Sequence, residues 1–102
     1  MRVFISQAMR GLSDEEIINT RKEAMRYAKK SLATNGDKIE FIDSFFQGAP
    51  VDAKPLWYIA KSIELLSTAD VCLFVGDWQN ARGCFIEHEC CVRYGIPIVY
   101  FK

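Results

Sequence analysis

A glycine and a glutamate four residues apart, Gly83 and Glu87, give this chain its clearest potential for catalysis. Residues at this spacing lie one helical turn apart, so a ligand that approaches the bare backbone of Gly83 would meet the carboxylate of Glu87. A carboxylate in such a crevice can attack an anomeric carbon, as retaining glycosidases do. The plainer alternative is an exposed helix carboxylate that pairs with Arg82 or Arg93.

A second group of candidate binding residues lies between residues 6 and 11. It consists of Ser6, Gln7, Arg10 and Gly11. A hydroxyl, exposed backbone N–H groups and a guanidinium near a helix N-terminus suit a phosphate or a carboxylate. The segment is neither a GxGxxG motif nor a P-loop, and Arg10 as a solvated surface charge is the alternative.

Two further loops contribute candidate binding residues. Asp43 follows one apolar segment, and Asp77 and Trp78 follow another. An aromatic side chain such as Trp78 can cover a nucleobase, and it can equally anchor its own loop.

The cysteines raise the alternative of a metal or redox protein. Cys84, His88 and Cys91 share a helical face and could supply three zinc ligands. No fourth ligand is evident, three ligands on one straight helix rarely converge on a tetrahedral ion, and a buried free cysteine packs like a small hydrophobe. We therefore expect no metal and no other cofactor. His88, the single histidine, leaves a Cys–His or Ser–His nucleophile pair open.

The elements that must position these residues alternate along the chain. Strands are predicted at 2–6, 38–42, 71–75 and 98–101, and helices at 13–35, 55–67 and 83–94. The second helix has Pro55 in its first turn, and the first begins at a capping box formed by Ser13 and Glu16. This order predicts an α/β, Rossmann/flavodoxin-like three-layer sandwich, with a parallel sheet of four or five strands and helices on both faces. Ligands of such folds bind beyond the carboxyl ends of the strands.

Composition narrows the class of protein. The chain has 102 residues, 50% of them hydrophobic, and its 13 basic and 13 acidic residues cancel. This predicts one domain spanning 1–102 and argues against a disordered tail, a membrane span and binding to a nucleic acid polymer. Four cysteines without a CxxC pattern fit free thiols, so we expect a cytoplasmic protein.

At this point the chain resembles a known family. Gly83 and Glu87, followed by Gly95 and Pro97, are similar to the signature of the nucleoside 2-deoxyribosyltransferases and of the related 2'-deoxynucleoside 5'-phosphate N-hydrolases. The segments ISQAMRG, IDSFF, AKPLWY, ADV and ARGCFIEHE look like those of small bacterial and phage members, so the likeness covers nearly the whole chain.

The resemblance implies a role for each matching residue. Glu87 would be the nucleophile that forms a covalent deoxyribosyl-enzyme intermediate. Asp70 would be a proton donor or positioning group near the base, with Asp77 as the alternative acid. A 5'-phosphate would bind at Ser6, Arg10 and Gly11.

The implied activity is cleavage of the N-glycosidic bond of a deoxynucleoside or its 5'-monophosphate, with the sugar passed to a second base or to water. The alternative is a non-catalytic nucleotide-binding or regulatory domain that uses the same crevice. We expect a homodimer or larger homo-oligomer, because a four-stranded sheet leaves edges that a partner can cover.

Overall fold

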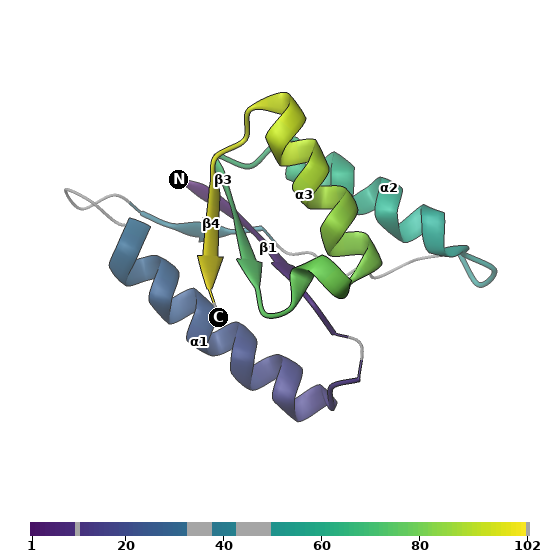
Figure 1. Cartoon of the computed structure of the whole chain (residues 1–102), viewed down its shortest axis with the longest axis horizontal. Helices are drawn as coiled ribbons and strands as arrows, with labels where there is room; N and C mark the ends of the chain where they lie inside the picture. The colour runs from purple at the N-terminus through teal and green to yellow at the C-terminus, as the bar shows by residue number, and fades with distance from the viewer. Residues whose placement is uncertain (10, 33–37, 43–49, 102) are drawn as a thin grey trace.

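A parallel sheet forms the centre of the chain, for which a computed structural model describes residues 1–9, 11–32, 38–42 and 50–101 (Figure 1). The strands in this part are β1 (Arg2–Gln7), β2 (Glu40–Phe41), β3 (Val71–Val75) and β4 (Ile98–Phe101). The helices are α1 (Asp14–Leu32), α2 (Pro55–Leu66) and α3 (Arg82–Tyr94), with a short 3₁₀ turn, η1, at Trp78–Asn80. All strand pairs are parallel, so the expected α/β sandwich is confirmed, with four strands among the described residues.

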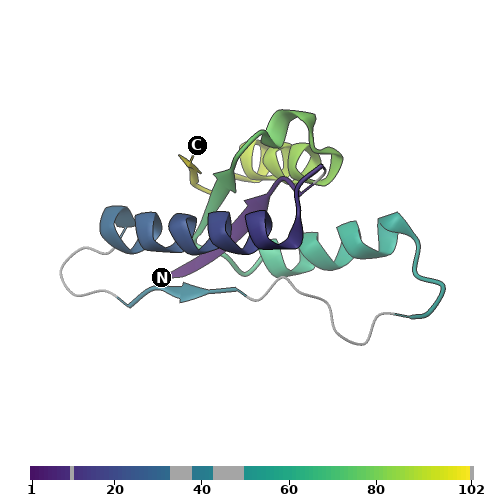
Figure 2. The same cartoon turned by 90° about the horizontal axis from the view of Figure 1, so that it is seen from below.

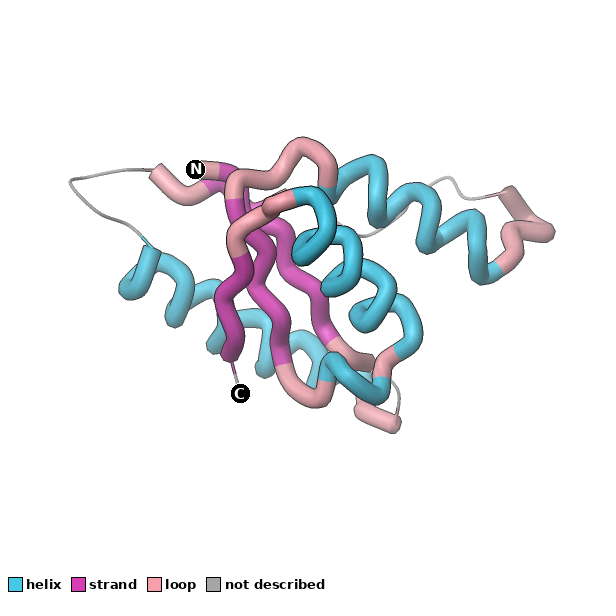
Figure 3. Tube along the Cα trace, turned by 45° about the horizontal axis from the view of Figure 1, so that its top comes forward, coloured by secondary structure: helices cyan, strands magenta, loops and turns pink. Residues whose placement is uncertain are grey.

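Alternate side chains of the two central strands build two separate cores. Val3 and Ile5 of β1 pack with Ala24 and Ala28 of α1, whereas Phe4 packs on the opposite face with residues of α2 and α3. This alternation follows from the two-residue period of a strand. Figure 3 shows α3 in front of the strands and α1 behind them, so the sheet lies between two layers of helices.

The strand order places a crevice in the middle of the sheet. The order is β2-β1-β3-β4, which is flavodoxin-like. From β1 the chain crosses to β2 on one side, and from β3 it crosses to β4 on the other. The loops after β1 and β3 therefore diverge, and ligands of this fold class bind at this switch point.

Local sequence signals explain where the helices begin and end. In the capping box, the Ser13 hydroxyl accepts a bond from the Glu16 N–H at 3.1 Å, and the Glu16 carboxylate accepts one from the Ser13 N–H at 3.3 Å. Pro55 stands in the first turn of α2, and Gly95 ends α3 at a φ of 73°, in the left-handed region that favours glycine.

Some predicted boundaries were wrong. β1 extends to Gln7, and β2 is limited to the two residues that pair with Arg2 and Val3. The predicted loop after β3 contains η1. α2 extends beyond the sheet (Figure 2), and Leu66 near its C-terminal end is its one fully buried side chain. No helix in the described ranges is long and apolar enough to cross a membrane.

Candidate active site

Glu87 is a buried carboxylate at the switch point of the sheet. It lies in the second turn of α3 with 6% of its surface exposed, and its Oε1 accepts a hydrogen bond of 2.9 Å from the hydroxyl of Ser6. Ser6, only 2% exposed, points from β1 to the α2 and α3 side of the sheet, as the alternation after Phe4 requires. The fold thus joins two residues 81 positions apart.

The surroundings of Glu87 favour its neutral form. Burial raises the pKa of the Glu87 carboxyl to about 7, and the hydrogen bond from Ser6 opposes this rise. None of the ion pairs found among the described residues involves Glu87. Charge on this carboxylate is therefore costly, and near neutral pH the group can both hold and release a proton. Carboxyl groups poised in this way are typical of sites that do chemistry.

Glu87 opens onto a cavity of about 410 Å³ between the carboxyl end of β1, the start of α3 and one face of α2. Polar side chains of its wall include Ser6 and Gln7 of β1 and Glu87 of α3, and α2 supplies Tyr58, Ile59 and Ser62. The volume suits a small molecule, because ligand pockets of this kind measure about 300–1,000 Å³. The cavity can therefore hold a small organic molecule against a buried carboxyl group.

Gly83 brings α2 close to the start of α3. A methyl group added at Gly83 would lie 3.1 Å from the Cδ1 atom of Ile59, tighter than an ordinary contact. Gly83, Ala81 and Ile59 also line an adjoining cavity of about 530 Å³, to which Asn80 and Arg82 contribute. The predicted placement of Gly83 beside Glu87 is thus what the structure shows.

The α2 residues of the cavity wall were not predicted. Tyr58 and Ser62 lie four residues apart, on one helical face, so their spacing is the signal that could have identified them. Cys84, which we had considered as a metal ligand, lines the same cavity.

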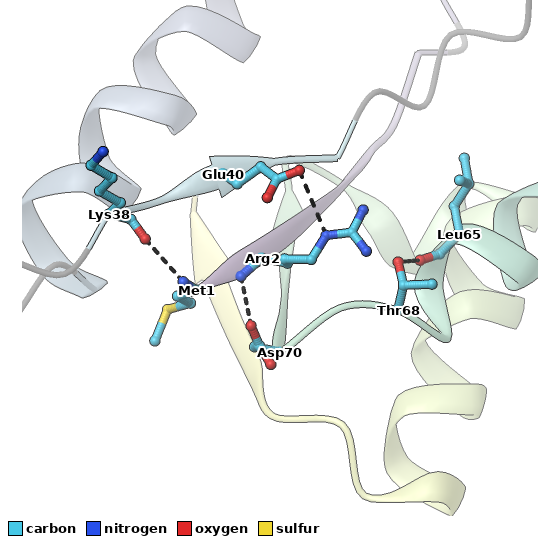
Figure 4. Close-up of polar contacts among 7 residues, drawn as sticks. All are labelled: Met1, Arg2, Lys38, Glu40, Leu65, Thr68 and Asp70. Carbon is cyan, nitrogen blue, oxygen red and sulfur yellow. Dashed lines mark hydrogen bonds and ion pairs between the residues drawn. The ribbon is translucent and has the colours of Figure 1, made fainter.

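Asp70 is not brought to Glu87. It precedes β3 and lies at the amino end of the sheet, where its Oδ2 accepts a hydrogen bond of 2.7 Å from the backbone N–H of Arg2 (Figure 4). Ser6, which bonds to Glu87, pairs in register with Phe74 of β3. Phe74 follows Asp70 by four residues, so at 3.3 Å per residue Asp70 and Ser6 lie about 13 Å apart along the strands. The role of proton donor beside Glu87 therefore does not fit Asp70.

Asp77 and Trp78 lie at the carboxyl end of β3 but outside the lining of the Glu87 cavity. The Asp77 carboxylate is exposed and accepts a hydrogen bond of 2.7 Å from the Asn80 amide. Trp78 stacks on His88 with ring centroids 3.9 Å apart, and it lines a different cavity beside β4. The structure therefore does not support Trp78 as a cover for a ligand of Glu87.

The remaining predicted binding residues are partly separated from the cavity. Gln7 lines it, but its Nε2 donates a hydrogen bond of 2.8 Å to the Ile17 carbonyl of α1. Gly11 is exposed, with a φ of 82° and open space around it. The predicted phosphate ligand Arg10 and the candidate Asp43 lie outside the described residues.

The three residues considered as alternative zinc ligands do not converge. Cys84 lines the cavity, His88 lies against Trp78 with its Nε2 2.7 Å from the Tyr100 hydroxyl, and Cys91 is buried in the core. In the part of the chain that the structure describes, no group of three or more His, Cys, Asp or Glu side chains could hold a metal ion.

Fold and site together define a class of protein, namely a parallel α/β domain with flavodoxin-like strand order and a buried glutamate in a cavity at its switch point. Residues 1–100 match DUF4406, a domain of unknown function, so the chain belongs to this family. Comparisons with curated proteins and with solved structures give no match.

Proposed function

We propose that this protein cleaves the N-glycosidic bond of a deoxynucleoside or its 5'-monophosphate, with Glu87 as the nucleophile. The observation that carries the proposal is a buried carboxylate, without an ion-pair partner among the described contacts, that faces a cavity of small-molecule size. The resemblance of Gly83, Glu87, Gly95 and Pro97 to the deoxyribosyltransferases names the substrate class.

The chemistry needs two displacement steps at one carbon. A free oxygen of the Glu87 carboxylate forms a bond to C1' of the sugar while the bond from C1' to the base nitrogen breaks, and its electron pair leaves with the base. The base takes a proton from water. In the second step, water or another base attacks C1' and releases the carboxylate, so hydrolysis consumes one water and transfer exchanges the bases.

The ionisation of the Glu87 carboxyl supports its proposed role as a nucleophile. Attack needs the ionised carboxylate, and a pKa of about 7 leaves a large fraction ionised at neutral pH. The surrounding low dielectric strengthens the interaction of that charge with the developing positive charge of the sugar. We also propose that the protein is cytoplasmic and that it forms a homodimer or larger homo-oligomer.

A specific observation favours a second candidate, a domain that binds nucleotides without cleaving them. Among the described residues that line the cavity, Glu87 is the only carboxyl group. Glycosidases use a pair of carboxyl groups, and no second one faces Glu87 in this part of the chain to protonate the departing base.

Incubation of the purified protein with the deoxynucleosides and their 5'-monophosphates, followed by chromatography for free base, tests the two candidates. We expect base release by the wild type, and its loss in Glu87→Gln. Glu89→Gln is the matched control, because Glu89 lies on the same helix and pairs at the surface with Arg93. Release that survives in Glu87→Gln contradicts the proposal. Saturable binding without release by the wild type supports the second candidate.

A further inference from the structure

Three polar side chains meet at the floor of the Glu87 cavity. The Ser6 hydroxyl donates a hydrogen bond of 2.9 Å to Oε1 of Glu87, and Cys84, one turn before Glu87 on α3, lines the same cavity. All three residues are buried, with at most 6% of their surface exposed. They come from two elements, β1 and α3.

The direction of the bond between Ser6 and Glu87 follows from the chemistry of the two groups. An ionised carboxylate can only accept, so the hydroxyl of Ser6 donates its single proton to Oε1 of Glu87. Burial raises the pKa of the nearby Cys84 thiol, so this neighbour keeps its proton and adds no charge beside Glu87.

Ser6 itself has little freedom to choose another partner. It lies in β1, between β2 and β3, and it pairs in register with Phe74 of β3. With 2% of its surface exposed, the side chain is fixed by its neighbours. Oε1 of Glu87 is therefore held, whereas none of the hydrogen bonds found among the described residues reaches Oε2.

We propose that Ser6 is a positioning residue, which holds Oε1 of Glu87 so that Oε2 is the oxygen that attacks the sugar. This rests on the proposed function, and it gives Ser6 a different role from the phosphate ligand that the sequence suggests. Ser6 contacts the nucleophile rather than the substrate.

The test combines a binding-independent titration with kinetics. In Ser6→Ala we expect the titration midpoint of the Glu87 carboxyl, followed by carbon NMR against Glu87→Gln as the blank, to rise by about one pH unit, because a hydrogen bond to a charged group is lost. We expect kcat for base release at pH 6.5 to fall about tenfold with little change in KM, and the pH profile of kcat to move upward with the midpoint.

Two further variants keep the outcome clear. Ser6→Thr retains a hydroxyl in a residue that favours strands, so it should restore the midpoint and kcat to near the wild-type values. Ser31→Ala, an exposed position of α1, should change neither. Circular dichroism checks that each variant is folded.

The failure of this inference differs from that of the proposed function. If Ser6→Ala leaves both the midpoint and kcat at their wild-type values, or if Ser6→Thr behaves like Ser6→Ala, the positioning role is wrong while cleavage through Glu87 stands. If the wild type releases no base, the proposed function fails, and the assignment of an attacking oxygen fails with it. This holds even if Ser6→Ala moves the titration midpoint of the Glu87 carboxyl.

Discussion

Two carboxylates at opposite ends of the same sheet have different surroundings. Asp70, at the amino end, is exposed and accepts a short bond from the Arg2 backbone, which ties the start of β3 to the start of β1. Glu87, at the carboxyl end, is buried and receives a hydroxyl bond from Ser6. Groups with shifted pKa values are common at functional sites, so position relative to the strands, more than residue type, separates the structural carboxylate from the candidate for catalysis.

The largest expected difference between these carboxylates lies in catalysis. Glu87→Gln should reduce base release at least about a thousandfold, because the nucleophile is lost. Asp70→Asn should keep the rate within a few-fold and lower the free energy of unfolding by about 1 kcal/mol, through the weakened bond to Arg2. Chromatography for free base and urea unfolding measure the two effects. A large loss of rate in folded Asp70→Asn would return Asp70 to the active site.

The next effect is on stability as a function of pH. The pKa of Glu87 is about 7 in the folded protein against an ordinary 4.5, so between these values the folded chain retains a proton that the unfolded chain has lost. Below pH 4.5 this proton contributes fully to the free energy of unfolding, by about 3 kcal/mol, and the contribution is lost as pH rises through about 7.

Urea unfolding at pH 4.5 and pH 8 measures this dependence. Glu87→Gln should unfold with a much smaller difference between the two conditions, because glutamine does not titrate. Glu89→Gln, at the exposed pair with Arg93, should keep the wild-type dependence. Equal pH dependence in the wild type and in Glu87→Gln would mean that burial does not penalise the charge.

The smallest expected effect tests whether the ligand uses the space between Gly83 and Ile59. Gly83→Ala places a methyl group 3.1 Å from the Ile59 side chain, which must shift into the space that a ligand would use. We expect KM to rise a few-fold with kcat nearly unchanged. The double variant Gly83→Ala with Ile59→Val should recover much of the KM, and an unchanged KM in the single variant would show that the ligand binds elsewhere.

Sequence patterns predict elements well where one local signal dominates. The apolar run Val71–Val75 is the strand that was expected, and the capping box at Ser13 marks the start of α1. β2 is harder to predict, because its length depends on which residues of β1 it meets, and that is decided by tertiary pairing.

The candidate site was predicted in part. Glu87 and Gly83 follow from helical spacing, and both line the cavity. Ser6 was predicted as a site residue, and it lines the cavity, but its bond to Glu87 was not predicted, since only the alternation along β1 shows that it faces α3. Asp70 was assigned from a resemblance, although a residue that precedes a strand lies at the end opposite to ligands.

The bond between Ser6 and Glu87 also constrains how the protein acquires its shape during synthesis. β1 is made early, yet one of its neighbours, β3, and the helix that carries Glu87 are made more than sixty residues later. The ribosome must therefore release most of the chain before the central strand can be enclosed, and such long-range closure is slow. An interrupted translation product that ends before β3 would expose β1, a segment in which Val3, Phe4 and Ile5 adjoin, and we expect it to aggregate.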